Sequence, residues 1–173
     1  MIRRFPDDAL LKECSRVETF DKGLALKAEY LTNVLKSNNL GIGLAANQAG
    51  LEDSIIIVLH NGKYHTLVNP EILWRSKDTV VCQEGCLSFP GLYLEIPRHA
   101  EIKATYQTIT GETKDVSASG LLAILLQHEI DHLGGMTFLS RTSPPSVGQN
   151  IARLIEQRQR RNLQRDSSRR NTK

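Results

Sequence analysis

The sequence predicts an α+β fold in which short antiparallel or mixed strands pack around a buried central helix. The middle of the chain, roughly residues 41–116, carries short β-branched or alternating runs separated by turn signals, without regular alternation of strands and helices. Helical patterns precede this stretch and follow it. The first helix after the strands is apolar on nearly every face, which is typical of a helix in the centre of a domain.

Length and composition are those of one ordinary globular domain. The chain has 173 residues, of which 40% are apolar and 24% are charged. No apolar run approaches the roughly 18 residues that a membrane span needs, and the first residues lack the apolar core of a signal peptide. We expect one catalytic domain over residues 1–157, a cytoplasmic location, no membrane contact and a monomer.

Two helices are predicted before the strands. Pro6-Asp7-Asp8 is a typical start for a short helix, and Asp21 can cap a longer one over about residues 22–37. The apolar residues of the longer helix recur at helical spacing: Leu24, Ala28, Leu31, Val34 and Leu35. Next comes the segment 41–48, where two glycines flank Ile42 and allow a close backbone approach. A phosphate loop is a weak alternative there, because the third glycine and the lysine are missing; an edge strand is the other interpretation.

The strands follow. Residues 55–59 are typical of a buried strand, Asn61-Gly62 of a tight turn, and residues 64–68 of the returning strand of a hairpin. Asn69-Pro70 is expected to end this run. Further strands are expected at 71–74, 79–81, 92–96, 100–106 and 113–116. The segment 84–91 is rich in Gly and Pro and is expected to be a loop or a bent edge strand.

The predicted central helix, residues 120–133, carries the motif with the clearest chemistry. His128 and His132 are four residues apart, so they lie on one face and can bind one metal ion. Glu129 is placed to act as general base on a metal-bound water. This motif alone would suggest a zinc-dependent peptidase, and it leaves open which residue is the third ligand. A last helix is expected from Ser143, with Val147, Ile151, Leu154 and Ile155 on its apolar stripe.

The three cysteines, Cys14, Cys82 and Cys86, are an odd number in a chain without a signal peptide, which argues against a disulfide framework. Cys82 and Cys86 are only loosely suggestive of a metal pair. Buried free thiols are the alternative for Cys14 and Cys82.

Three segments together resemble the three motifs of the peptide deformylases, in the order of that family. They are Gly41-Ile42-Gly43-Leu44-Ala45-Ala46-Asn47-Gln48, Glu84-Gly85-Cys86-Leu87-Ser88 and Gln127-His128-Glu129-Ile130-Asp131-His132. The similarity runs from about Ile2 to Arg141. Three motifs in order are far more specific than any one of them.

The resemblance implies a metal-dependent hydrolase that removes the formyl group from the N-terminal formyl-methionine of nascent polypeptides. Cys86, His128 and His132 would be the ligands of one divalent metal ion, with Fe(II) as the native ion and Zn, Ni or Co as alternatives. Metal-bound hydroxide would be the nucleophile and Glu129 the general acid and base. The Gln48 amide and the Leu87 N–H would stabilise the developing oxyanion.

The resemblance also implies a binding site for the formylated peptide. Gly43 would pair with the peptide backbone as an added strand, and Gly85 would contact it. Ile42, Leu125 and Phe89 would form the methionine pocket, although plain core packing is the alternative for Ile42 and Leu125. A Glu84–Arg98 ion pair would brace the loop of Cys86. Asp131 would orient a ligand or form a surface pair.

Two positions depart from the family pattern, and the C-terminal segment lies beyond the resemblance. Asn47 stands where many relatives have proline, and Phe89 is bulkier than the usual aliphatic residue, which would narrow the substrate entrance. Residues 158–173 contain seven basic residues against one acid within a net charge of only +3, and we expect a flexible tail. It is either solvated or in contact with ribosomal RNA through phosphates.

Two competing hypotheses remain. A general zinc peptidase would give Cys86 no role. An inactive relative that only binds formylated peptides or ribosomes is disfavoured, because every expected catalytic residue is present.

Overall fold

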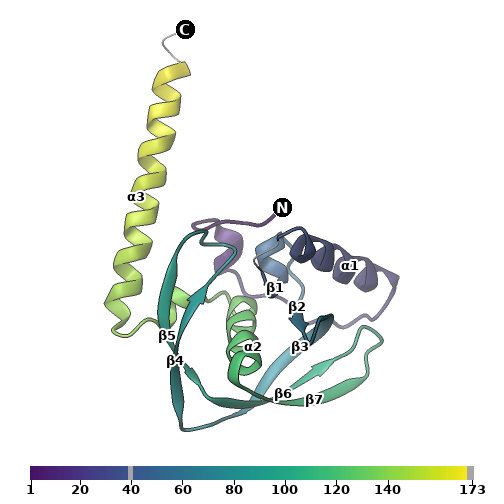
Figure 1. The fold of residues 1–173 in the computed structure, drawn as a ribbon. Helices are drawn as coiled ribbons and strands as arrows, with labels where there is room; N and C mark the ends of the chain where they lie inside the picture. The colour runs from purple at the N-terminus through teal and green to yellow at the C-terminus, as the bar shows by residue number, and fades with distance from the viewer. Residues whose placement is uncertain (39–40, 171–173) are drawn as a thin grey trace.

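The computed structural model describes residues 1–38 and 41–170 (Figure 1). Its α-helices are α1 (Lys22–Lys36), α2 (Gly120–Leu133) and α3 (Pro145–Arg170). Its strands are β1 (Gly43–Ala45), β2 (Ile55–His60), β3 (Lys63–Arg75), β4 (Thr79–Gly85), β5 (Tyr93–His99), β6 (Glu101–Gln107) and β7 (Thr113–Ser119). Short 3-10 helices lie at Asp8–Leu11, Ala46–Ala49 and Phe138–Arg141.

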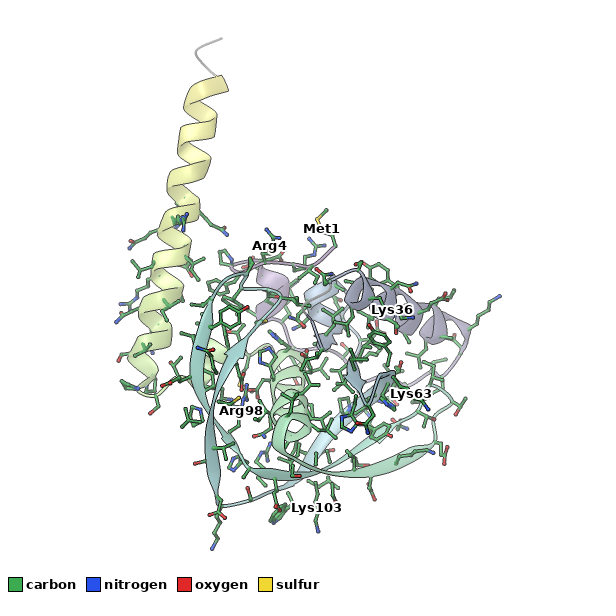
Figure 2. All side chains as sticks on the ribbon, viewed as in Figure 1. Met1, Arg4, Lys36, Lys63, Arg98 and Lys103 are labelled. Carbon is green, nitrogen blue, oxygen red and sulfur yellow. The ribbon has the colours of Figure 1, made fainter. Side chains whose placement is uncertain are left out.

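The strands form two antiparallel sheets with α2 between them. One sheet has five strands in the order β1-β2-β3-β6-β7, and the other is the ribbon β4-β5. In Figure 1, α2 lies in the middle of the body, with the β4-β5 ribbon on one side and β1, β2 and β3 on the other. Side chains fill the space between this helix and the strands (Figure 2). The predicted α+β class is confirmed.

Strand β2 is buried on both faces because a helix covers each side of the sheet. Ile55 and Ile57 belong to the core cluster under α1, whereas Ile56 and Val58 belong to the cluster under α2. Side chains of a strand alternate between its two faces, so a run of four apolar residues serves two cores at once.

Both predicted internal helices form at the expected positions. The Asp21 side chain accepts a hydrogen bond from Leu24 N at 3.0 Å and caps α1. The five apolar residues expected on its stripe are all buried. Helix α2 has Ser119 at its N-cap position, although the Ser119 side chain makes no capping bond, and most of its second half is buried.

The prediction that Asn69-Pro70 ends the hairpin strand is wrong. Strand β3 continues through both residues to Arg75, with a shift of register against β6 between Val68 and Glu71. Asn69 adopts a φ of 49°, and its side-chain amide bonds the N–H and the C=O of Val17 at 2.8 and 2.9 Å. These bonds hold the bulged residue inside the sheet.

The N-terminal segment ties two of the three sequence motifs together. Arg3 N donates to Gln48 O at 2.7 Å, and Phe5 N donates to Ser88 O at 3.0 Å. The Phe5 ring stacks on Phe89, with ring centroids 5.0 Å apart. The loop after β4 is therefore held against the 3-10 helix Ala46–Ala49 by the first residues of the chain.

Helix α3 packs its beginning on this aromatic cluster and then leaves the body (Figure 1). Ile151 and Ile155 contact the cluster that contains Phe138, but the expected stripe is only partly right because Val147 is 41% and Leu154 65% exposed. Gln159 Nε2 donates to Phe5 O at 3.0 Å.

The helical backbone continues through Arg170, where the sequence predicted a flexible tail from residue 158. Flexibility of this segment stays a prediction, and its last residues, 171–173, lie outside the described part of the chain. Within the described ranges, none of the helices combines the length and the apolar character that crossing a membrane requires.

Candidate metal centre and active-site pocket

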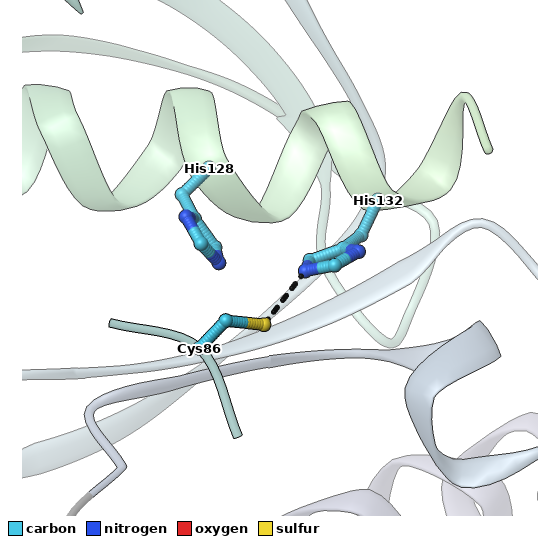
Figure 3. A group of neighbouring side chains, drawn as sticks. All are labelled: Cys86, His128 and His132. Atoms are coloured by element: carbon cyan, nitrogen blue, oxygen red, sulfur yellow. Dashed lines mark hydrogen bonds between the residues drawn. The ribbon is translucent and has the colours of Figure 1, made fainter. Parts of the chain in front are cut away.

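The fold brings Cys86, His128 and His132 together, although they come from different elements (Figure 3). Cys86 follows β4 directly, and both histidines lie on α2. One ligand atom of each residue lies within 4.8 Å of the other two. Cys86 Sγ is 3.3 Å from His132 Nε2, and the two imidazole rings have centroids 5.0 Å apart.

This donor set fits a divalent transition metal. A thiolate and two imidazoles are ligands that such ions prefer, and three protein ligands leave one position for water or substrate. The geometry supports the fit, because His132 is buried with Nε2 facing the sulfur, and its Nδ1 has no hydrogen-bond partner among the described residues. Cys14 and Cys82 are free thiols outside this group. Burial raises the pKa of the Cys14 thiol to about 11.

His128 is oriented by a carboxylate. Its Nδ1 lies 2.8 Å from Glu84 Oε2, so its Nε2 is left for the metal side of the ring. Burial alone would raise the pKa of Glu84, but hydrogen bonds from His128 and Arg98 lower it. Glu84 is therefore a carboxylate that accepts from the ligand and fixes the ring.

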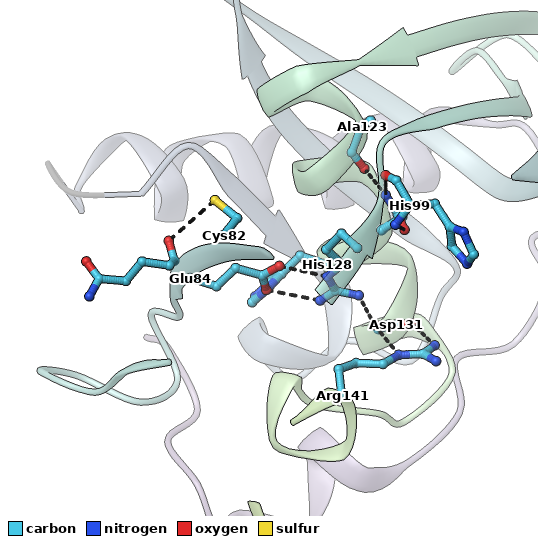
Figure 4. A network of polar contacts seen from close by, with 10 residues as sticks. Cys82, Glu84, His99, Ala123, His128, Asp131 and Arg141 are labelled. Carbon is cyan, nitrogen blue, oxygen red and sulfur yellow. Dashed lines mark hydrogen bonds and ion pairs between the residues drawn. The ribbon is translucent and has the colours of Figure 1, made fainter. Parts of the chain in front are cut away.

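A chain of buried charges continues from Glu84 (Figure 4). Arg98 donates from Nε and Nη2 to Glu84 at 2.7 and 3.0 Å, and from Nη1 to Asp131 at 2.5 Å. Arg141 donates to the same Asp131 at 3.0 and 2.5 Å. The predicted Glu84–Arg98 pair is confirmed. Asp131 is itself buried and contacts Arg98 inside the protein and the partly exposed Arg141, which corrects the expectation of a surface pair.

The two histidines carry opposite pKa shifts in the protein without metal. Burial alone would lower the pKa of His128, but hydrogen bonds with Cys86 and Glu84 raise it to about 10. Burial lowers the pKa of His132 well below its usual value. His132 is thus neutral and ready to bind a metal, whereas His128 holds a proton that metal binding must release.

Glu129 lies between His128 and His132 in the sequence, and it is shielded from solvent. It is 3% exposed, its Oε2 has no partner among the described residues, and burial raises its pKa to about 7. Its other oxygen lies against the backbone of Gly43. A Cβ atom at position 43 would clash with Glu129 Oε1 and would lie 2.6 Å from Leu125 Cδ1. A side chain at position 43 would therefore displace the Glu129 carboxyl group or Leu125.

Gln48 presents its amide N–H groups to the centre. Its Oε1 accepts from Ala45 N at 2.8 Å, which fixes the orientation of the amide. Its Nε2 then donates to Ser88 Oγ at 3.1 Å and lies 3.4 Å from Cys86 Sγ. The Leu87 N–H lies in the same loop, and no hydrogen bond recorded within residues 1–38 and 41–170 uses it.

One pocket of about 700 Å³ opens onto this group. Every residue expected in substrate binding lines it: Ile42, Gly43, Gly85, Phe89 and Leu125. Ile42 is 39% exposed at the mouth, whereas Leu125 is buried. Phe89 is 4% exposed between Phe5 and Phe138, so it belongs to the wall of the pocket and does not narrow its entrance.

Sequence reasoning missed Leu121 and Ile124, which also line the pocket. Leu121, Leu125 and His128 follow one face of α2 at spacings of four and three, so helical periodicity could have found Leu121. Ser88, which bonds Gln48, was also missed, because nothing local in the sequence marks that contact.

The fold and the site together define a metal-dependent hydrolase: an open three-ligand centre with a buried carboxyl beside the first ligand. A sequence model of the family "Polypeptide deformylase" matches residues 1–147. The chain belongs to the polypeptide deformylase family.

Individual relatives agree with this assignment. A peptide deformylase of Thermotoga maritima is 38% identical over 144 residues, which cover 83% of this chain and 87% of that protein. The crystal structure of the Thermotoga maritima enzyme superposes with a TM-score of 0.79 at 36% identity, covering 82% of this chain and 95% of the other. A plant peptide deformylase superposes with a TM-score of 0.84 at 33% identity, covering 93% of this chain and 91% of the other.

Proposed function

We propose that this chain hydrolyses the formyl group from the N-terminal formyl-methionine of nascent polypeptides and releases formate. Family membership supports the reaction class. The observation that carries the proposal for this chain is the convergence of Cys86, His128, Glu129 and Gln48 on one pocket, with His132 grouped beside Cys86 and His128.

Cys86, His128 and His132 are the residues that would hold one divalent metal ion. The soft thiolate together with two imidazoles suits Fe(II), which we propose as the native ion, and also Zn, Ni and Co. When bound, the ion acts as a Lewis acid and lowers the pKa of water at the site.

Glu129 moves the proton. Its buried carboxylate takes a proton from the attacking water as the water oxygen bonds the formyl carbon. It then delivers this proton to the nitrogen as the C–N bond breaks, which yields formate and a free amine. The pKa of about 7 that burial gives Glu129 is suited to both roles near neutral pH.

Gln48 and Leu87 stabilise the negative charge that develops on the formyl oxygen. The Gln48 amide is fixed before substrate binds, since Ala45 N holds its oxygen and Ser88 accepts from its nitrogen. Fixed donors of this kind need no reorganisation during the reaction, and loss of one typically reduces turnover about 100-fold or more.

The pocket holds the methionine and the first peptide bonds. The exposed side of β1 at Gly43, together with Gly85, would pair with the backbone of an extended peptide. Ile42, Leu125 and Phe89 supply apolar wall for the methionine side chain, and Leu121 and Ile124 extend it. A relative from Synechococcus elongatus is described in complex with actinonin, so we expect actinonin to bind this pocket as well.

Three further aspects belong to the proposal: a monomeric state, a cytoplasmic location where translation occurs, and ribosome contact through the basic segment 158–173. Seven basic residues against one acid support a phosphate contact. Truncation after Gln157 should weaken ribosome binding and reduce its dependence on salt concentration. Unchanged binding would contradict the proposed ribosome contact.

Formate release from formyl-Met-Ala-Ser by protein prepared without oxygen and loaded with Fe(II) tests the reaction. Glu129→Gln should lose activity by about 100-fold or more and retain metal, whereas Cys86→Ala should lose both. A Cys86→Ala protein that keeps its metal and cleaves internal peptide bonds would favour a general peptidase instead.

A further inference from the structure

Asn47 lies directly behind His132, across 85 residues of sequence. It is 3% exposed within the 3-10 helix Ala46–Ala49. Its Nδ2 donates to the backbone carbonyl of His132 at 2.5 Å. The same carbonyl also accepts from Gly135 N at 3.0 Å. The Asn47 amide therefore fixes the end of α2 at the residue that carries the second imidazole.

Two further polar atoms of this pair are buried without a partner among the described residues. They are Asn47 Oδ1 and His132 Nδ1. Their chemistry is complementary, because an amide oxygen accepts and the Nδ1–H of a neutral imidazole donates. The tautomer with the proton on Nδ1 is the one that leaves the Nε2 lone pair free on the side of Cys86 Sγ.

We infer that Asn47 is a positioning residue for His132. Its Nδ2 holds the His132 carbonyl. The two atoms without a partner among the described residues make no direct hydrogen bond with each other, so the link we infer is one buried water molecule that accepts from His132 Nδ1–H and donates to Asn47 Oδ1. This contact selects the metal-binding tautomer and fixes the plane of the ring. The inference rests on the metal role proposed for His132.

Other residues at position 47 cannot position His132 in the same way. A proline at position 47 would have no side-chain donor or acceptor. An aspartate keeps an acceptor for Nδ1–H but loses the donor to the carbonyl. Comparison of such residues therefore separates the role of the Asn47 donor, Nδ2, from that of its acceptor, Oδ1.

Cobalt affinity, measured by competition with a chelator, tests the inference without reference to activity. Asn47→Ala should bind cobalt about 10- to 100-fold more weakly, and the absorption band of the cobalt–thiolate bond should shift as the ring reorients. Asn47→Asp should lie closer to the wild type. Equal cobalt affinity in Asn47→Ala and the wild type would overturn the inference.

A matched control separates positioning from general loss of stability. Gln127 is another buried amide on α2, and it bonds Ala123 O and the backbone of His99. Gln127→Ala should lower the melting temperature of the metal-free protein as much as Asn47→Ala does and should leave cobalt affinity unchanged. Equal losses of affinity in both variants would contradict a specific role for Asn47.

Two further measurements test the tautomer of His132 in the wild type and distinguish failure of the inference from failure of the proposed metal centre. Nitrogen-15 NMR of the metal-free wild type should show the His132 proton on Nδ1 and protected from exchange; a proton on Nε2 would overturn the inference. Cys86→Ala should lose cobalt binding altogether. If it does and Asn47→Ala keeps full affinity, the metal centre stands and only the role of Asn47 fails. If Cys86→Ala also keeps full affinity, the centre fails too.

Discussion

His128 and His132 lie one turn apart on α2, yet the protein holds them by different means. His128 rests on Glu84, which belongs to a chain of charges formed with Arg98, Asp131 and Arg141. The neighbour recorded behind His132 is a neutral amide, that of Asn47. The charged side comes from the β4-β5 ribbon, and the neutral side from the short helix after β1.

This difference matters because both neighbours can hold a histidine in place, but only a charged neighbour changes the pKa of its imidazole by its charge. A buried carboxylate fixes His128 firmly. Burial alone would lower the pKa of this imidazole, but hydrogen bonds with Cys86 and with the Glu84 carboxylate raise it, which opposes metal binding at low pH. The Asn47 amide holds the backbone carbonyl of His132 without adding a charge, and burial lowers the pKa of this imidazole. Each of the following predictions tests one side of this comparison or the carboxyl group between them.

The largest effect is expected on the charged side. Glu84→Ala removes the bidentate partner of a guanidinium that is 3% exposed, so the metal-free protein should lose about 3 kcal/mol of unfolding free energy. Urea unfolding measures this loss.

Lys27→Ala is the control for Glu84→Ala, because it breaks a partly exposed pair with Asp53 and should change stability by less than about 1 kcal/mol. Equal losses in the two variants would show that the buried network does not hold the fold.

The position of the Glu129 carboxyl group should depend on the absence of a side chain at Gly43. Gly43→Ala inserts a methyl group where Glu129 Oε1 and Leu125 lie. A displacement of the carboxyl by about 1 Å should lower kcat/KM about 100-fold and leave the metal bound. Formate release and metal analysis measure the two quantities.

Gly62→Asn is the control for Gly43→Ala. Position 62 has a φ of 73°, which asparagine tolerates, and nothing lies within 4 Å of the added Cβ. This variant should keep full activity. Full activity in Gly43→Ala would show that Glu129 has room to move.

Metal affinity should rise with pH because of the charged side. The pKa of His128 is raised to about 10 in the metal-free protein, so this residue carries a proton at pH 7 that must leave when metal binds. Each released proton makes affinity rise about tenfold per pH unit. Calorimetry in buffers of different ionisation enthalpy counts the protons. A variant with Glu84→Gln should show a weaker dependence of metal affinity on pH. A metal affinity that does not change between pH 6 and 8 would contradict the assignment of this proton to His128.

The smallest effect is expected at the outer end of the network. The Arg141 side chain is 42% exposed, and Asp131 keeps Arg98 when Arg141 is removed. Arg141→Ala should therefore destabilise the protein by about 1 kcal/mol or less. A loss as large as that of Glu84→Ala, measured by thermal unfolding, would mean that the charges act as one unit.

Local pattern was sufficient for the helices and most strands. The apolar stripe and the Asp21 cap locate α1, and the all-round apolar face locates α2. The bulge at Asn69 escaped prediction because a contact with Val17, 52 residues away, replaces the lost strand bonds. Local propensity carries no information about such a partner.

The residues of the site also divide into those that local sequence pattern predicts and those that it does not. The spacing of His128 and His132 follows from helix geometry, whereas Cys86 came from resemblance to a family because no spacing rule connects a loop to a distant helix. Leu121 follows from periodicity once Leu125 is accepted as pocket wall. The Asn47–His132 contact is invisible in the sequence, since 85 residues separate the two and no local pattern connects their segments.

The bracing of Phe5 has a consequence for the order in which the protein matures. Phe5 N holds Ser88, yet the cluster around the Phe5 ring also contains Phe138, Ile151 and Ile155, and Gln159 bonds the Phe5 carbonyl. A chain emerging from the ribosome exposes its first residues long before these late partners exist. All three ligand residues are translated before the last supports of the Cys86 loop, so this loop gains its full set of contacts only after Gln159 has emerged.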